Sequence, residues 1–150
     1  MGFGDAQPAV DAFTALTKAY NEALRNPAAT SPTAFNEYVA GQAKNAYDAS
    51  LADEKAQGRA FRGTPPANRL IVKSSDVTTT VPTVTLENCV LLSTTHPWTE
   101  YTLATGKAVP TSAPVNVSPP YPTTIKMFKP TAAGWVATSF TTDPTKTCTR

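Results

Sequence analysis

The sequence has no long apolar run and little charge. None of its hydrophobic stretches approaches the roughly 20 residues that a helix needs to cross a bilayer, which excludes a transmembrane protein. Charged residues make up 16% of the 150 residues, and the formal net charge is +2. Because Lys and Arg form no cluster, nucleic-acid binding is excluded, and the composition also excludes a charged disordered chain and a coiled coil.

Histidine, cysteine and glycine are also scarce. The chain has one His and two Cys, which cannot assemble a zinc-ligand set, and neither Cys belongs to a C-x-x-C pair. The seven Gly are scattered, so there is no glycine-rich phosphate loop. No G-x-S-x-G element and no carboxylate cluster for calcium is present. The sequence therefore predicts no catalytic set, no metal site and no cofactor.

Threonine and proline, by contrast, are abundant. The chain has 25 Thr and 14 Pro, a composition typical of an extracellular, β-rich surface. The start, Met1-Gly2-Phe3-Gly4-Asp5, lacks the basic and apolar segments of a signal peptide, and Ala6 stands where a myristoylation motif needs Ser or Thr. Two interpretations follow: a cytosolic protein, or an exported domain without its signal segment. The cysteines favour the second.

Cys89 and Cys148 favour a disulfide bridge. Cys148 lies close to the end of the sequence, where chains usually fray, and a bridge would hold that end in place. The alternatives are two free thiols, or a Cys89–His96 pair that no motif supports. A bridge implies an oxidising compartment, and so a secreted or cell-envelope location.

Two helical stretches come first. Apolar residues recur at three- and four-residue steps from Pro8 to Arg25, and Asn26-Pro27 ends that helix. Ser31-Pro32 is a good N-cap for a second helix, which Gly58 ends. Gly41 is a point at which this second helix could divide.

After Gly58 the apolar period changes to that of strands. Turn residues separate the predicted strands, and 108–122 is predicted as a long loop. Pro130 to Gly134 has the length of a hairpin loop between the last two strands. The predicted strands are 59–63, 70–80, 83–92, 98–103, 124–129 and 135–140.

The order of elements predicts the fold class. Strands follow strands without helices between them, so the expected fold is α+β, with the N-terminal helices packed on a curved antiparallel sheet of four to six strands. The whole of residues 1–150 is predicted to be a single domain. Its helices occupy about 8–57 and its sheet about 59–142, and the disulfide ties the C-terminal tail.

Several short motifs carry a resemblance to a known superfamily. They are the strand Val84-Thr85-Leu86-Glu87-Asn88-Cys89, Trp98, the Tyr101-x-x-x-Thr105-Gly106 turn, the Gly134-Trp135-Val136-Ala137 element, Cys148, and Arg62-Gly63-x-Pro65. Together they resemble the nuclear-transport-factor-2-like superfamily, a cone-shaped cystatin-like α+β roll, and within it small secreted proteins and lipoproteins of actinobacteria. Asn88 replaces the acid that is usual before the first Cys, and Ala133 replaces a Gly.

This resemblance covers about residues 59–148 in motif and 9–57 in pattern. It implies a curved sheet wrapped around the helices and a bridged Cys pair. It implies no activity for the narrower group. The wider superfamily includes isomerase-like and cyclase-like enzymes that place an acid or His base and a Tyr-type donor inside the cone.

Four aromatic residues are candidates for lining such a cavity: Tyr20, Tyr47, Trp98 and Tyr101. The sequence predicts no catalytic residue among them. Tyr20 and Tyr47 lie on the apolar stripes of the helices, a position that favours a packed core over a cavity lining.

Three titratable residues are the remaining candidates. Asp48 is expected on the solvated side of its helix, and Glu100 is expected to face water if Tyr101 faces the helices. His96 is the one histidine, and its Thr-Thr-His-Pro setting predicts a surface turn.

The function expected from these observations is a non-enzymatic exported domain that binds a protein or cell-wall partner or serves as a cell-envelope accessory. The alternatives are a small-molecule enzyme or binder that uses the cone cavity, and a phage or plasmid structural module. A filled interior favours the first. An open apolar pocket with a buried acid or His favours the enzyme.

Overall fold

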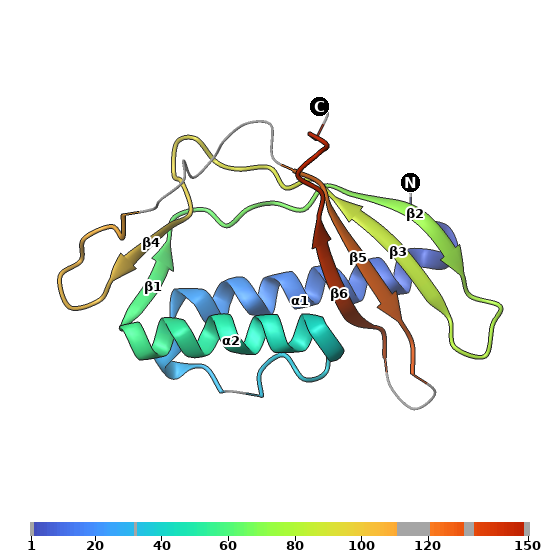
Figure 1. The fold of residues 1–150 in the computed structure, drawn as a ribbon, viewed down its shortest axis with the longest axis horizontal. Helices are drawn as coiled ribbons and strands as arrows, with labels where there is room; N and C mark the ends of the chain where they lie inside the picture. Colours follow the sequence, from blue (N-terminus) through green and yellow to red (C-terminus); the bar gives the residue numbers. More distant parts are fainter. Residues whose placement is uncertain (1, 32, 111–120, 131–133, 149–150) are drawn as a thin grey trace.

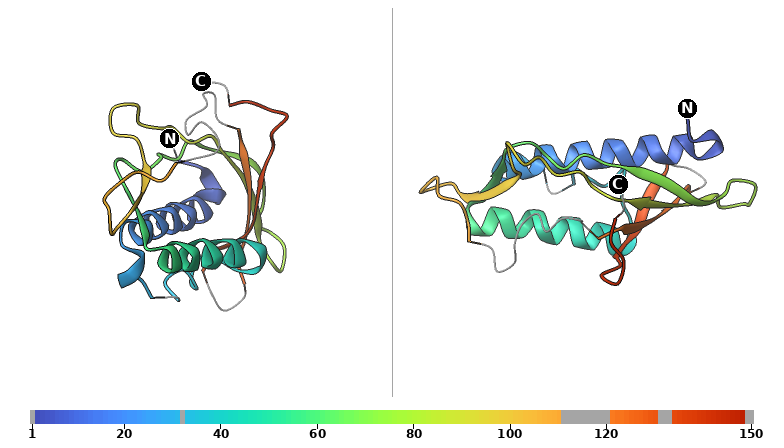
Figure 2. Two further views of the ribbon diagram at one scale, coloured as in Figure 1. Left: turned by 60° about the vertical axis from the view of Figure 1, so that its left-hand side comes forward. Right: turned by 90° about the horizontal axis from the view of Figure 1, so that it is seen from above.

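A computed structural model describes residues 2–31, 33–110, 121–130 and 134–148 (Figure 1). The two main helices lie side by side and run in the same direction, one sheet near each end of the pair (Figures 1 and 2). The elements are η1 (Gly4–Ala6), α1 (Gln7–Arg25), η2 (Pro27–Ala29), α2 (Gly41–Gln57), β1 (Arg59–Arg62), β2 (Leu70–Asp76), β3 (Thr83–Asn88), β4 (Thr99–Thr102), β5 (Thr123–Phe128) and β6 (Val136–Thr142).

The chain has an α+β fold, as the order of elements predicts. Among the described residues, the pairs between its strands are all antiparallel. They form two sheets: a four-stranded sheet in the order β2-β3-β5-β6 and a two-stranded β1-β4 ribbon. Neither sheet closes on itself, so the arrangement is an open one.

The two sheets are ends of one long hairpin. Between them, Ala67 and Leu91 exchange two backbone hydrogen bonds of 2.9 and 2.8 Å. Pro65 and Pro66, which precede Ala67 in the chain, have no N–H to donate to the ladder. β3 ends at Asn88 and not at Leu92 as predicted, because the Arg69 N–H donates to the side-chain oxygen of Asn88 instead of to a backbone carbonyl. This interruption separates the β1-β4 ribbon from the four-stranded sheet, and the functional site described below lies beside it.

α1 forms as the sequence predicts. Pro8 lies in its first turn, where a missing N–H has little consequence, and the helix ends at Arg25 before Asn26-Pro27. The predicted stripe faces the core: Val10, Phe13, Leu16 and Leu24 are buried.

The predicted start of the second helix at Ser31 is wrong, because α2 begins at Gly41. The segment before it pairs with β6 instead: the Ala40 N–H donates to the Ala137 carbonyl, and the Ala137 N–H donates to the Tyr38 carbonyl, both at 2.9 Å. Gly41 has φ +57°, a conformation that side chains disfavour, and so permits the turn from this extended segment into the helix.

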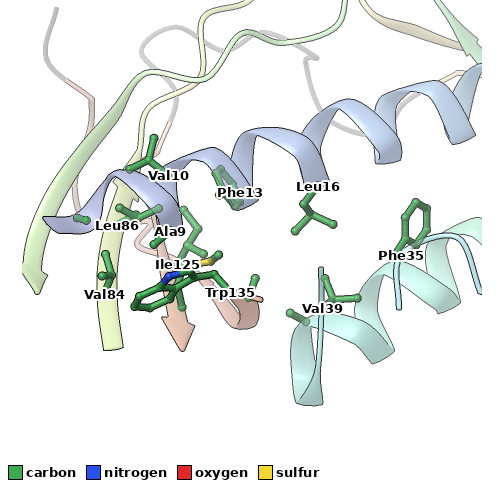
Figure 3. Close-up of a cluster of buried hydrophobic side chains, with 14 of the residues drawn as sticks. Ala9, Val10, Phe13, Leu16, Phe35, Val39, Val84, Leu86, Ile125 and Trp135 are labelled. Atoms are coloured by element: carbon green, nitrogen blue, oxygen red, sulfur yellow. The ribbon is translucent and has the colours of Figure 1, made fainter. Parts of the chain in front are cut away.

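A β-bulge in β6 resolves a competition between two apolar faces. Strict alternation would place Trp135 and Phe140 on opposite faces. In the structure, Lys126 pairs with Ser139 while Met127 pairs with Ala137, so Thr138 is the extra residue. Phe140 consequently packs against the same core as Trp135. Figure 3 shows Trp135 among the buried side chains beneath α1.

The antiparallel β5–β6 pair predicted from the sequence is also confirmed. The predicted hairpin loop between the two strands includes 131–133, which lie outside the described residues. The predicted long loop over 108–122 includes 111–120, which also lie outside them.

The Cys89–Cys148 disulfide is present, with an S–S distance of 2.10 Å. It joins the end of β3 to the C-terminal segment, which confirms the predicted bridge. Within the described part of the chain, no helix has the length and apolar character needed to cross a membrane.

Candidate functional site

An open pocket of about 400 Å³ lies between the two helices and the four-stranded sheet, beside the interruption of the long hairpin. Its lining comes from both helices, from the hairpin segments around that interruption, and from β5 and β6. None of the described side chains that line it carries a charge. They are Phe13, Thr17, Tyr20, Asn21, Ala46, Tyr47, Pro66, Asn68, Asn88, Val90, Thr123, Ile125 and Phe140.

Stacked aromatic rings form one wall. Tyr47 of α2 lies between Tyr20 of α1, at a centroid distance of 4.2 Å, and Phe140 of β6, at 5.1 Å. Phe35 meets both tyrosines edge-on from behind the stack. Such contacts add to the stabilisation that burial of the rings already provides. The stack fixes the wall where three elements meet.

The tyrosine hydroxyls of this wall remain protonated. Burial raises the pKa of Tyr47, and the neighbouring Tyr20 raises it further. Burial also raises the pKa of Tyr20, whose hydroxyl lies 2.7 Å from Ser50 Oγ. At neutral pH both groups can donate or accept hydrogen bonds, and neither acts as a base.

A chain of hydrogen bonds in the lining links β3 to α1. Asn88 Nδ2 donates to Asn68 Oδ1 at 2.9 Å, and Asn68 Nδ2 donates to Thr17 Oγ1 at 3.0 Å. Thr17 Oγ1 donates in turn to the Phe13 carbonyl at 2.7 Å. The Asn88 oxygen accepts the Arg69 backbone N–H at 2.9 Å. This chain fixes the orientation of the amides that line the pocket.

Asn88→Ala is expected to lower the free energy of unfolding by about 1–3 kcal/mol. The substitution removes both hydrogen bonds of a buried amide and leaves Asn68 Oδ1 without its donor. Urea unfolding measures the loss. Asn45→Ala, on the exposed side of α2, is the matched control. Equal stabilities of the two variants would contradict a structural role for the amide chain.

The structure separates the four predicted cavity candidates into two pairs. Tyr20 and Tyr47 line the pocket. Trp98 and Tyr101 belong to the β1-β4 end of the molecule, away from the lining. There Trp98 stacks on Phe61 at 5.4 Å, and guanidinium groups lie over both rings, Arg25 at 4.9 Å from Trp98 and Arg62 at 4.6 Å from Tyr101.

The titratable candidates do not line the pocket. His96 is exposed in its turn, as expected for a surface histidine. Its backbone N–H donates to Ser93 Oγ at 3.0 Å. Asp48 is half-buried and pairs with Lys44 one turn before it. From the sequence, Glu100 is expected to face water. In the structure it interacts with the carboxyl group of Glu54.

Glu54 is a buried acid that the sequence analysis did not single out. It is 5% exposed, and its Oε2 has no hydrogen-bond partner within the described part of the chain. Its pKa is raised to about 8, mainly by burial and further by the facing Glu100 and the neighbouring Asp53. Arg59 acts in the opposite direction and lowers the pKa. The sequence does hold a signal for this position, because Tyr47, Leu51 and Glu54 follow helical spacing on one face.

Glu54→Gln is expected to remove a pH dependence of stability. The folded-state pKa of Glu54 lies above the unfolded one, so the wild type loses stability as the pH rises from about 4.5 to about 8. The amide keeps the shape of the side chain and cannot ionise. The free energy of unfolding of the variant minus that of the wild type should therefore be a few kcal/mol larger at pH 9 than at pH 5.

Urea unfolding at pH 5, 7 and 9 measures this difference. Glu22→Gln, on the exposed side of α1, is the control and should follow the wild type at every pH. If Glu54→Gln also follows the wild type, the Glu54 carboxyl does not titrate in the way that its burial demands.

Comparison with known proteins gives a structural relative and no sequence family. No family model matches the chain, and no curated protein matches it. Its fold is similar to the crystal structure of the intermembrane space region of chloroplast protein ARC6, with a TM-score of 0.59 and 17% sequence identity. The match covers 92% of this chain and 95% of that one. At this identity the similarity establishes the α+β fold alone.

Proposed function

We propose that the protein is a non-enzymatic exported domain, a cell-envelope accessory that binds its ligand in the pocket between α1, α2 and the four-stranded sheet. The observation that carries the proposal is the pocket itself, an open space of about 400 Å³ lined by aromatic and uncharged polar side chains. Binding sites for small molecules are typically concave and mostly apolar, with a few fixed polar groups.

Two observations support the exported location. The Cys89–Cys148 disulfide belongs to an oxidising compartment. The structural relative is a region of an intermembrane space, which is compatible with an envelope location. Membership of the nuclear-transport-factor-2-like superfamily, and kinship with secreted proteins and lipoproteins of actinobacteria, are part of the same proposal. The α+β fold supports this part of the proposal.

The chemistry of the lining supports binding over catalysis. General acid–base catalysis works best with a group that titrates near the operating pH. Tyr20 and Tyr47 have raised pKa values, and the lining side chains Asn21, Asn68 and Asn88 do not titrate in this range. The one strongly shifted carboxyl of the described chain, Glu54, is not part of the lining.

Filling the pocket tests the proposal. Ala46 is exposed and lines the pocket, so Ala46→Trp puts a large side chain at its rim with little effect on the core. Nile red, an uncharged apolar dye, is the probe. We expect the wild type to bind the dye with a rise in fluorescence, and Ala46→Trp to bind it at least 10-fold more weakly.

Ala52→Trp, another exposed position of α2 outside the lining, is the matched control and should bind like the wild type. His96→Ala should also bind normally. If Ala46→Trp binds Nile red as strongly as Ala52→Trp does, the pocket is not the binding site and the proposal fails.

A further inference from the structure

The lining of the pocket limits the chemistry of its ligand. We infer that the pocket takes an uncharged small molecule with a flat apolar ring system and a carbonyl or hydroxyl oxygen. This inference rests on the proposed function, because it assigns a ligand class to the same site.

The absence of charge from the lining sets the first limit. All 13 described residues of the lining are uncharged at neutral pH. An ionised ligand group would lose its hydration there and meet no opposite charge, which costs far more than burial of a neutral polar group. Arg25 and Arg62 lie over aromatic rings at the β1-β4 ribbon, outside the lining. Carboxylates, phosphates and ammonium groups are therefore disfavoured.

The aromatic wall sets the second limit. Tyr20, Tyr47 and Phe140 form a continuous stack, in which the last two rings are inclined by only 7°. Aromatic rings pair favourably with other aromatic rings in offset-stacked or edge-to-face arrangements, so a ring of the ligand is stabilised more by this wall than an aliphatic chain is. The volume of about 400 Å³ falls within the range of small-molecule sites, roughly 300–1,000 Å³.

The amides set the third limit. The hydrogen bonds between Asn88, Asn68 and Thr17 use one N–H of each amide group. Asn21 of α1 also lines the pocket, and its side chain makes no hydrogen bond within the described part of the chain. These amides give the pocket N–H donors, which suit a ligand oxygen that accepts a hydrogen bond.

Displacement of Nile red by three matched probes tests this inference. The probes are 2-acetylnaphthalene, naphthalene and 2-naphthoate, which share a ring system and differ in the attached group. At pH 7 the ketone should displace the dye at least 10-fold more effectively than the ionised carboxylate. It should also bind more tightly than naphthalene, by the roughly 2- to 10-fold that one hydrogen bond contributes.

Asn21→Leu keeps the pocket filled to a similar extent and removes one donor. It should reduce the preference for the ketone over naphthalene while leaving naphthalene binding unchanged. Asn45→Leu, outside the lining, should change neither value. If Asn21→Leu leaves the preference intact, Asn21 is not a donor to the ligand and the third limit is wrong.

The outcomes separate this inference from the proposed function. Binding of 2-naphthoate as tight as that of the ketone, and abolished by Ala46→Trp, would overturn the ligand class and leave the pocket as the binding site. If Ala46→Trp abolishes dye binding but no naphthalene probe displaces the dye, the inferred ligand class is also wrong. A side chain of a protein partner would then be the occupant of the pocket. Insensitivity of all binding to Ala46→Trp would overturn the proposed function itself.

Discussion

Trp135→Ala is expected to lower the free energy of unfolding by about 3–5 kcal/mol. Trp135 is 8% exposed and belongs to the main core cluster, where Figure 3 shows it with Ala9, Val84 and Ile125. Removing the indole leaves a large cavity that the surrounding strands and α1 cannot fill. Because domains of this size are stable by only about 5–15 kcal/mol, the loss is a large part of the total.

Chemical unfolding followed by circular dichroism measures this loss without relying on the missing indole. Leu103→Ala is the control, because Leu103 is 49% exposed, and its effect should stay within about 0.5 kcal/mol. A Trp135→Ala protein that keeps its stability and loses only ligand binding would show that Trp135 belongs to a binding surface and not to the core.

Removing the disulfide with the pair Cys89→Ser and Cys148→Ser is expected to cost about 4 kcal/mol. The bridge spans 59 residues of sequence, so it restricts a large part of the unfolded chain, and Cys148 is the buried anchor of the C-terminal segment. The double variant and the reduced wild type should unfold at the same denaturant concentration, well below the oxidised wild type.

Non-reducing mass spectrometry is the direct check on the bridge. It should find a mass 2 Da below that of the reduced chain, since forming one disulfide removes two hydrogens. Two free thiols in protein purified from an oxidising compartment would contradict both the bridge and the exported location that it supports.

Local patterns predict α1 and the central parts of the strands well. The stripe of Val10, Phe13, Leu16 and Leu24 is periodic over about four turns, and Asn26-Pro27 ends the helix through local sterics. The start of α2 is different, because a local N-cap at Ser31 competes with pairing to Ala137. That partner lies about 100 residues away in sequence, and no local pattern of residues 31–40 indicates it.

The candidate site could be predicted only in part for the same reason. Tyr20 and Tyr47 stand out because each lies on a helical apolar stripe. The amides of Asn68 and Asn88 meet across two hairpin segments, and their contact depends on a register that turn residues do not define. The resemblance to a cone-shaped roll makes Trp98 and Tyr101 candidates too, but it does not indicate that regular pairing is interrupted after Asn88. That interruption leaves both residues at the β1-β4 ribbon.

Glu54 shows the limit of residue type as a guide to burial. A glutamate near the end of a helix is ordinarily solvated, and only its spacing from Tyr47 and Leu51 indicates a buried position. Its carboxyl is costly to bury when ionised, so the structure places it where Glu100 and the fold together favour the protonated form.

Chemical-shift mapping tests the central claim, that the pocket is the binding site, most directly. The experiment titrates 2-acetylnaphthalene into ¹⁵N-labelled protein and records the backbone and side-chain amide signals. If the ligand binds in the pocket, the largest shifts should fall on Asn21, Ala46, Tyr47 and Asn88 and on the other residues of the lining. Ala46→Trp should abolish these shifts. Shifts concentrated instead on the β1-β4 ribbon, around Trp98, and unchanged by Ala46→Trp, would contradict it.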